Sequence, residues 1–383
     1  MVYNTDRSRI ANAACECGYS LNGTADSEYA VFTELMENDF LHMDTDNITD
    51  YGWRPQVYNV SVPADNHRIA YGKDFSMANI VPNPLKNSKK WSGDADHGGD
   101  AGLELWVRGD HSHGYVNGSE IVSVRDDILH GSFRVGMKLS NSSGTCGAFF
   151  FVRCSPSTAY QTTADYRQYY NNSQEIDMEF LSHEFNSSGG AVNLVLQSPE
   201  SVAHGNDAAG TATYKVAPLP FKPDNMFHEY RFDWTADRVA FYVDGAFLWE
   251  MTEQIPTEGG GIFFNHWSNG DPNWSAGPPD ADTVMTLSYV KGYFNSTDTD
   301  RSQNDYKKRC PKFDPAKVCQ IPAQTSAPDV SLGPDAPKTY FFSQQEGMTP
   351  GQILYSNGAT LAGAPVVSIL APLLVALISW TLA

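Results

Sequence analysis

The stretch "SQEIDMEFLS" (173–182) constrains the fold most, because it indicates a strand and also says what each of its two faces carries. Apolar residues occupy every second position, and this period is that of a strand with one buried face. The carboxylates of Glu175, Asp177 and Glu179 alternate with them and share the opposite face. Three unpaired like charges in a row repel one another, so that face is either fully solvated or has a function.

Similar alternating runs follow along the middle of the chain, with turn residues between them and few convincing helices. Asp244-Gly245 between two such runs is typical of a type I′ hairpin turn. Many antiparallel strands with few helices predict an all-β, jelly-roll-like sandwich, in which one sheet curves into a groove for a long polymer. The runs are 131–139, 147–153, 191–198, 228–234, 239–251, 261–267 and 283–294.

The charge balance and the glycosylation motifs indicate where the protein works. A net charge of −19 argues against a nucleic-acid partner, which requires basic patches. Asn-X-Ser/Thr motifs are more frequent than chance supplies, which favours passage through a eukaryotic secretory pathway. They begin at Asn22, Asn47, Asn59, Asn117, Asn141, Asn171, Asn186, Asn273 and Asn295.

The six cysteines are even in number, as a disulfide framework requires. Cys146 and Cys154 flank a predicted strand and would lie roughly 26 Å apart if it is extended. A disulfide needs Cα atoms within about 7 Å, so we expect no direct bridge between them. The C-terminal two cysteines either pair locally or bridge to the N-terminal two, which are too close together to pair easily. These four are Cys15, Cys17, Cys310 and Cys319.

The C-terminus carries a membrane-targeting pattern, whereas the N-terminus lacks the pattern of a signal peptide. The last residues, "APVVSILAPLLVALISWTLA", are apolar to the end, and no charged residue follows Glu346. Small residues at 356–358 precede this tail, which is the layout of a glycosylphosphatidylinositol (GPI) attachment signal. A retained tail anchor is the alternative. The N-terminus has no apolar segment of a signal peptide, so we expect the recorded start to be incomplete or misassigned.

The spacing of the acidic residues fits a pair of catalytic carboxyl groups. The Cα atoms of Glu175 and Glu179 lie roughly 13 Å apart in a strand, and side chains leaning together bring the carboxyl groups to about 5 Å. Retaining glycosidases use that separation for a nucleophile and a general acid. Asp177 lies between them, where it can share a proton and separate their pKa values. A solvated acidic strand is the plain alternative, but the apolar neighbouring runs indicate a central strand.

The motif "EIDMEF" resembles the signature of glycoside hydrolase family 16, in the form found in its lichenase-like and xyloglucan transglycosylase branches. The stretches "SEIVSVRDDILHGSFRVGMKL", "FHEYRFDWTADRVAFYVDG" and "FFNHWSNG" are similar to other segments of the family, in the same order, over about residues 30–297. The resemblance implies a concanavalin A-like jelly roll with a concave glycan-binding cleft. It also implies Glu175 as nucleophile, Glu179 as general acid/base and Asp177 as the assisting acid.

The same resemblance supplies candidate substrate-binding residues. Glu120 falls where the family has a sugar-binding Glu, and Asn265 and Trp267 fall where it has a cleft Asn and Trp. Trp267 as a core residue is the alternative. Asn193 shares the face of the acids if the strand register holds. Trp274, in a Gly/Pro-rich loop, belongs either to the rim of the cleft or to loop packing.

Two positions depart from the family pattern. Lichenases carry a Trp two residues before the nucleophile, where this chain has Ser173, so Tyr169 or Tyr170 is expected to substitute. An Arg two residues after the sugar-binding Glu is replaced by Val122. Both departures weaken a claim for mixed-linkage glucan. The anchor signal and the Pro-rich stretch after 320 look instead like fungal wall enzymes of this family.

The sequence therefore predicts a retaining β-glucanase of the cell surface, GPI-anchored, without a cofactor or metal and monomeric. The alternatives are a transglycosylase joining wall β-glucan or chitin, a non-catalytic glycan-binding wall protein, and an inactive relative. The His-rich 111–113 and acidic 94–100 match no firm metal site and are predicted to be loops. The predicted parts are an N-terminal extension (1–29), the catalytic domain (30–297), a Cys-containing tail with an extended linker (298–350) and the anchor signal (351–383).

Overall fold

The computed structural model describes residues 14–23, 25, 29–62, 64, 67–154, 170–204, 207–335 and 338–349. Residues 1–13 and the predicted anchor signal at 351–383 lie outside these residues. None of the described helices is long and apolar enough to cross a membrane.

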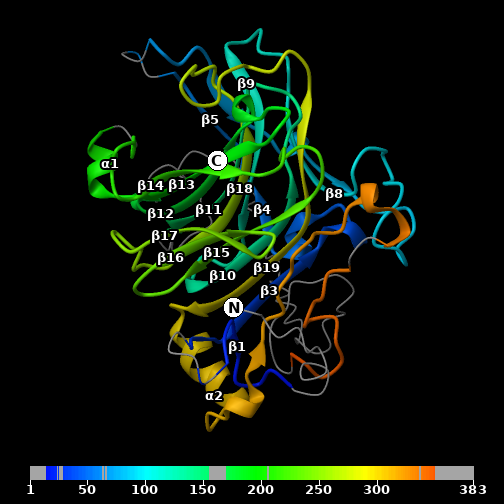
Figure 1. Ribbon diagram of the computed structural model, residues 1–383, viewed down its shortest axis with the longest axis vertical. Helices are drawn as coiled ribbons and strands as arrows, with labels where there is room; N and C mark the ends of the chain where they lie inside the picture. The colour runs from blue at the N-terminus through cyan, green and yellow to red at the C-terminus, as the bar shows by residue number, and fades with distance from the viewer. Residues whose placement is uncertain are drawn as a thin grey trace, which may run out of the picture.

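Two large β-sheets form the body of the protein (Figure 1). The first has eight strands and lies on the side of the sandwich away from the acidic strand. Its strands in spatial order are β17 (Ala246–Met251), β16 (Val239–Val243), β15 (His228–Trp234), β10 (Ile128–Lys138), β19 (Thr283–Ser296), β8 (Gly102–Val107) and β7 (Ile80–Asn83), and β3 (Glu34–Asp39) also pairs with β19.

The second sheet has nine strands and contains the acidic strand, β12. Its order is β14 (Tyr214–Leu219), β13 (Gly190–Gln197), β12 (Tyr170–Leu181), β11 (Cys146–Cys154), β18 (Gly261–Trp267), β9 (Tyr115–Ser123), β6 (Gly72–Phe75) and β5 (Tyr58–Val60), and β4 (Trp53–Pro55) also pairs with β9. A small third sheet holds β2 (Val31–Phe32), β1 (Tyr19–Ser20) and β20 (Cys319–Gln320).

The described helices are all short and lie in the connections between strands. The α-helices are α1 (Pro199–Ala203) and α2 (Tyr306–Arg309), the latter continuing the π-helical η7 (Asp300–Asp305). The 3-10 helices are η2 (Phe40–His42), η3 (Ile48–Tyr51), η4 (Met77–Asn79), η6 (Ser182–Glu184), η8 (Pro315–Lys317) and η9 (Val330–Asp335).

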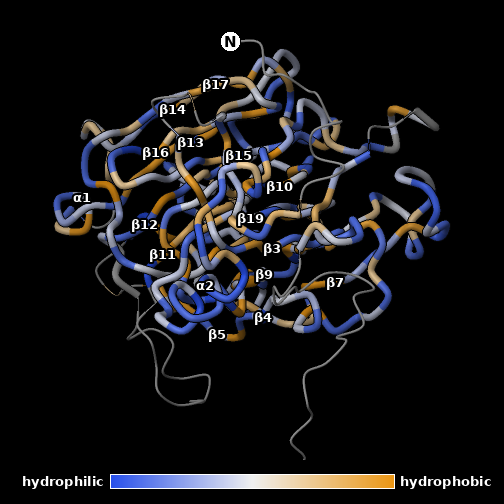
Figure 2. The backbone as a smooth tube through the Cα atoms, turned by 90° about the horizontal axis from the view of Figure 1, so that it is seen from below, coloured by the Kyte–Doolittle hydropathy of each residue, from blue (hydrophilic) through white to orange (hydrophobic). Residues whose placement is uncertain are grey.

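The main core lies between the two large sheets. Hydrophobic stretches gather in the central strands, and hydrophilic ones in the surrounding loops (Figure 2). Aromatic rings connect the layers: Phe149 of β11 stacks on Phe264 of β18 at 5.0 Å and contacts Phe232 of the opposite sheet at 4.9 Å. The predicted all-β jelly-roll sandwich is confirmed. The predicted hairpin is also present, because Asp244 and Gly245 both have positive φ between β16 and β17.

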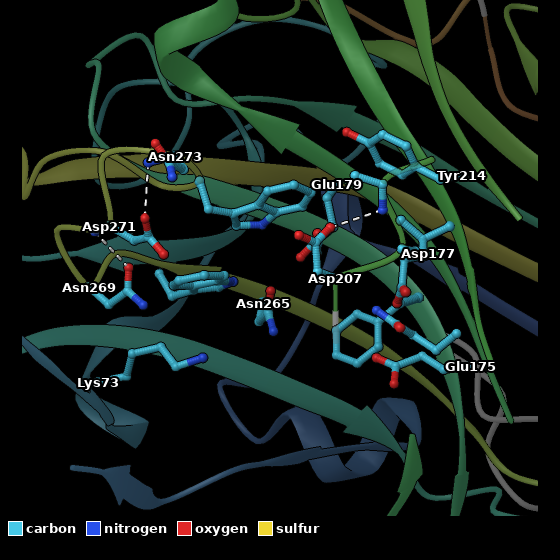
Figure 3. A pocket seen from close by; sticks show the side chains of 18 of the residues that line it. Lys73, Glu175, Asp177, Glu179, Asp207, Tyr214, Asn265, Asn269, Asp271 and Asn273 are labelled. Carbon is cyan, nitrogen blue, oxygen red and sulfur yellow. Dashed lines mark hydrogen bonds between the residues drawn. The ribbon is translucent and has the colours of Figure 1, made fainter. Parts of the chain in front are cut away.

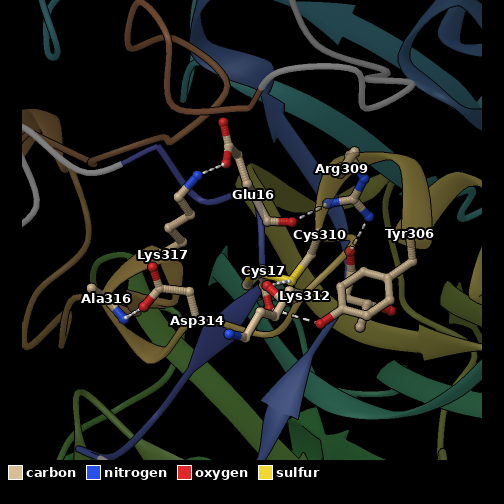
Figure 4. Close-up of a disulfide and its surroundings, with 10 residues drawn as sticks. Glu16, Cys17, Tyr306, Arg309, Cys310, Lys312, Asp314, Ala316 and Lys317 are labelled. Carbon is tan, nitrogen blue, oxygen red and sulfur yellow. Dashed lines mark hydrogen bonds and ion pairs between the residues drawn. A yellow bond between two sulfur atoms is a disulfide. The ribbon is translucent and has the colours of Figure 1, made fainter.

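Two disulfides join the two ends of the described chain. Cys15 bridges to Cys319 and Cys17 to Cys310 (Figure 4), so the C-terminal cysteines bridge to the N-terminal pair rather than to each other. An ion pair between Lys317 and Glu16, 2.5 Å long, lies beside them.

Cys146 stands apart from this framework. It lies at one end of β11, is buried and carries a free thiol. The expectation that it does not bridge directly to Cys154 is confirmed. The side chain of Cys154 itself lies outside the described residues.

The segment after β20 differs from the predicted extended linker. Residues 320–335 and 338–349 pack against the outer side of the first sheet, where the side chains of Ile321, Phe341 and Phe342 are buried. Glu37 of β3 accepts hydrogen bonds from the backbone N–H groups of Phe342 (3.1 Å) and Ser343 (2.8 Å). The Pro-rich composition suggested a solvated chain, but these apolar anchors and the buried carboxylate hold it against the sheet.

Candidate active site

The acidic strand β12 lies in the interior of its sheet, with β11 on one side and β13 on the other. Its apolar residues Ile176 and Met178 are completely buried in the core between the sheets. The register places Glu175, Asp177 and Glu179 on the opposite face, in line with Val152, Phe150 and Ala148 of β11. The strand therefore presents its three carboxylates to the outer face of the second sheet, as the alternation predicts.

These carboxylates line a cleft of about 700 Å³ across the second sheet (Figure 3). Residues from β5, β6, β9, β11–β14 and β18 and from the connections beside them form its floor and walls. The lining side chains are Tyr58, Arg68, Lys73, Glu120, Ala148, Phe150, Glu175, Asp177, Glu179, Val195, Gln197, Asp207, Ala208, Ala209, Tyr214, Asn265, Trp267, Asn269, Asp271, Asn273 and Trp274.

The three acids form a chain of interactions. Asp177 donates a hydrogen bond to Glu175. Glu179 accepts hydrogen bonds from the Cys146 thiol, with Sγ 3.6 Å from Oε1, and from Trp274. The free thiol and the loop tryptophan thus fix the carboxylate of Glu179 from two directions, and Asp177 fixes that of Glu175.

Burial in this cleft raises the pKa of all three carboxyl groups, because desolvation disfavours their charged forms. The pKa of Glu175 rises to about 8 and that of Glu179 to about 7, while that of Asp177 rises well above its ordinary value. Because Asp177 has its pKa raised by both neighbouring charges as well, it holds the proton shared with Glu175. When this pair carries one negative charge, the charge therefore rests on Glu175.

This burial has a measurable effect on stability. The pKa of Glu179 in the folded protein lies above its ordinary value of 4.5. Between about pH 4.5 and about pH 7 the group is ionised in the unfolded chain but still protonated in the folded protein, so the free energy of unfolding falls as pH rises through this range. We expect Glu179→Gln to increase the free energy of unfolding by roughly 3 kcal/mol at pH 8 and to leave it unchanged at pH 4. Thermal unfolding across this range measures the difference. Glu200→Gln on the exposed α1 is the matched control, and a gain independent of pH would contradict the account.

A second polar group lies on the β9 and β18 side of the cleft. Glu120, a buried carboxylate of raised pKa, accepts hydrogen bonds from Tyr58 (3.0 Å) and from Nδ2 of Asn265 (3.1 Å). The Oδ1 atom of Asn265 has no hydrogen-bond partner among the described residues, although it is buried. Glu120 and Asn265, both predicted to bind substrate, thus lie together in the cleft, and Oδ1 of Asn265 is an acceptor that a ligand could use.

The two predicted tryptophans both line the cleft but differ in how they do so. Trp267 is only 8% exposed, packs with Phe75 and Cys146, and has the Lys73 ammonium 4.1 Å from its ring centre. Trp267 therefore packs in a hydrophobic cluster and also lines the cleft, so each of the two interpretations is partly correct. Trp274 is half-buried and hydrogen-bonds to Glu179, which supports the rim interpretation.

Two other predicted residues are placed differently. Asn193 shares the face of the acids, but it is 1% exposed and does not line the cleft, because Tyr214 of β14 covers it. The prediction that Asn193 contacts the substrate is therefore wrong for this geometry. The backbone of Tyr170 pairs with Cys154 at the start of β12. The side chain of Tyr170, like the whole of Tyr169, lies outside the described residues.

Several cleft residues were not predicted. Lys73 on β6 and Tyr214 on β14 come from strands without a recognisable motif, and Arg68 pairs with Asp271 at 2.9 Å on the rim. Gln197 could have been found, because it lies in register with Glu175 and alternates along β13 in the same way as the acids alternate along β12. Within the described ranges, no group of three or more His, Cys, Asp or Glu side chains gathers as metal ligands do.

The chain is similar to several known proteins. The family model of "Glycosyl hydrolases family 16" matches residues 85–291. The beta-glucanase of Bacillus subtilis (strain 168) is 28% identical over 146 residues, which are 38% of this chain and 50% of that protein. A Crh-like protein of Arthroderma benhamiae is 33% identical over 131 residues, 30% of this chain and 25% of that one.

The chain thus spans half or less of the length of these two relatives. Among solved structures, the Bacillus licheniformis beta-glucanase covers 68% of this chain and 97% of its own, with 19% identity and a TM-score of 0.44. LamAcat from Zobellia galactanivorans covers 71% of this chain and 100% of its own, with 16% identity and a TM-score of 0.47. Because the family model covers more than half of its residues, this chain belongs to glycosyl hydrolase family 16.

Proposed function

We propose that the protein is a retaining endo-β-glucanase that cleaves cell-wall β-glucan by double displacement. The observation that carries the proposal is the row of three carboxylates on the floor of the cleft, Asp177 buried and Glu175 and Glu179 half-buried, with Asp177 donating a hydrogen bond to Glu175. A binding protein gains nothing from placing three repelling acids together, whereas an ionised nucleophile and a protonated general acid require pKa values that are separated.

In the proposed reaction Glu175 attacks the anomeric carbon and forms a covalent glycosyl ester. Glu179 donates its proton to the oxygen of the leaving sugar, which departs with the electron pair of the broken glycosidic bond. Asp177 stabilises the anionic form of Glu175 before the attack through its hydrogen bond. Glu179, now ionised, then takes a proton from an incoming hydroxyl, and this hydroxyl displaces Glu175 from the sugar.

Transglycosylation is the second candidate, because the incoming hydroxyl belongs either to water or to another sugar. Both outcomes use every residue named above up to the covalent intermediate. In a transglycosylase the acceptor would be wall β-glucan or chitin. The disulfides, the glycosylation motifs and the apolar tail support an extracellular protein, GPI-anchored at the cell surface. We propose a monomer.

Product analysis tests the proposal. The full chain is incubated with laminarin, lichenan and soluble chitin oligosaccharides, singly and mixed, and product masses are followed over time. Shorter glucan products establish the glucanase and name the linkage. Products longer than the substrates, or hybrid between them, establish transfer instead. No change of mass on any substrate would refute both enzymatic proposals and favour the glycan-binding alternative.

The pH dependence of the reaction follows from the protonation state that Glu179 needs as general acid. Its pKa is raised to about 7, so the protonated fraction falls about tenfold per pH unit above that value. Glu175 must be ionised to act as the nucleophile, and its pKa is about 8, so we expect kcat/KM to be highest between pH 7 and 8 and to be about sixfold lower at pH 6 and at pH 9. The measurement is kcat/KM on a soluble glucan between pH 4 and 9. A profile that stays flat to pH 9 would exclude Glu179 as the acid.

A further inference from the structure

Tyr214 of β14 lines the cleft, although neither the EIDMEF motif nor the alternation of polar and apolar residues predicts this position. It lies two strands away from the acids, at the edge of the second sheet. The connection between β13 and β14 adds Asp207, Ala208 and Ala209 to the same wall. Figure 3 shows Tyr214 entering the cleft from the side opposite to Lys73.

The hydroxyl of Tyr214 is held by two residues outside the cleft lining. It donates a hydrogen bond of 2.7 Å to Oδ1 of Asn193. The Nδ2 group of Asn193 in turn donates to Oε2 of Glu184 at 3.1 Å. Because a carboxylate only accepts, the amide of Asn193 is fixed with its oxygen toward Tyr214, and Tyr214 must be the donor of that bond. Its hydroxyl therefore offers only acceptor capacity to a ligand in the cleft.

The backbone of Tyr214 is in register with Val195 and, through it, with Asp177, and its hydroxyl reaches toward the Glu179 end of the acidic row. Asn193, which holds it, is the direct register partner of Glu179 between β12 and β13. Burial raises the pKa of Tyr214, and the charges of Glu184, Glu179 and Asp207 raise it further, so the phenol stays neutral. A sugar bound against Glu179 on this side of the cleft meets the ring and the hydroxyl of Tyr214.

We propose that Tyr214 binds the sugar on the leaving-group side of the scissile bond, its hydroxyl accepting a hydrogen bond from a sugar hydroxyl and its ring contacting the sugar face. Asn193 and Glu184 are positioning residues that act through Tyr214. This inference rests on the proposed function, because Glu179 defines the leaving-group side only if it protonates the leaving oxygen. It explains why Asn193 is buried beneath the cleft rather than exposed in it.

The test compares two substrates that differ only on the leaving-group side. A linear β-glucan has a sugar there, whereas a nitrophenyl β-gluco-oligosaccharide has only the aromatic leaving group. For Tyr214→Phe we expect kcat/KM on the glucan to fall about 3- to 10-fold, the effect of one neutral hydrogen bond, and to stay unchanged on the nitrophenyl substrate. Tyr242→Phe, on β16 in the other sheet, is the matched control.

A double substitution isolates the positioning role of Asn193. Asn193→Ala alone is expected to reproduce the loss on glucan, and adding it to Tyr214→Phe to reduce kcat/KM no further. Equal losses on both substrates, or no loss on either, would overturn the assignment of Tyr214 while leaving the glucanase in place. A wild-type protein that cleaves neither substrate would instead refute the proposed function. Thermal unfolding confirms that each variant is folded.

Discussion

Glu175→Ala is expected to lower turnover of glucan at least about 10³-fold, because it removes the group that forms the covalent intermediate. The small azide anion fits the space left by the carboxylate and attacks the same face of the sugar. Azide is therefore expected to restore turnover of an aryl β-gluco-oligosaccharide and to give an α-glycosyl azide. The anomeric configuration is read by NMR.

Glu179→Ala is the companion experiment, because the two acids have different proposed roles. With a good leaving group no acid is required, so the covalent ester on Glu175 still forms. Azide then attacks from the opposite face, where Glu179 normally activates water, and the product is a β-glycosyl azide. Glu200→Gln is the control that leaves activity unchanged. The same azide anomer from both variants would contradict the assignment of roles.

The second large effect concerns the two disulfides, whose bridged cysteines lie 304 and 293 residues apart. Either one keeps the long loop closed when the other is removed, so the disulfide that is removed had closed only a further loop of about a dozen residues, 15–17 and 310–319. We expect Cys15→Ser with Cys319→Ser to cost about 3 kcal/mol of unfolding free energy, and the same for the other pair. Removing both is expected to cost about 8 kcal/mol, more than the sum of the two single losses.

Denaturant unfolding of the three variants measures this difference. The prediction has a clear control in Cys146→Ser, because Cys146 forms no disulfide and its removal leaves the long loop closed. Losses that are simply additive would show that the two disulfides do not close the same loop in the unfolded chain. They would also show that the N-terminal and C-terminal segments dissociate independently from the body of the protein.

The part of the site that lies on one strand was predictable from the sequence. Period-two alternation at 173–182 was enough to give the strand, its buried face and the common direction of Glu175, Asp177 and Glu179. The hairpin at Asp244-Gly245 was equally local, since two successive positive φ angles favour these residues. Both rest on interactions within a few residues of the chain.

The rest of the site depends on which strands become neighbours, and a pattern within one strand does not contain this information. Lys73 and Tyr214 reach the cleft from β6 and β14, near opposite edges of the sheet. Asn193 has the predicted direction, but the next strand brings Tyr214 over it. The composition of the segment after β20 suggests a solvated linker. The sequence does not reveal that Glu37, on β3, accepts hydrogen bonds from backbone N–H groups of this segment.

Trapping the covalent intermediate tests the central claim most directly. The protein is incubated with a 2-deoxy-2-fluoro β-gluco-oligosaccharide carrying a good leaving group, which slows hydrolysis of the ester more than its formation. The account predicts a mass increase of one glycosyl group per chain, located by peptide mapping to Glu175. Attachment to another residue, or turnover of glucan that inverts the anomeric centre without an ester, would contradict it.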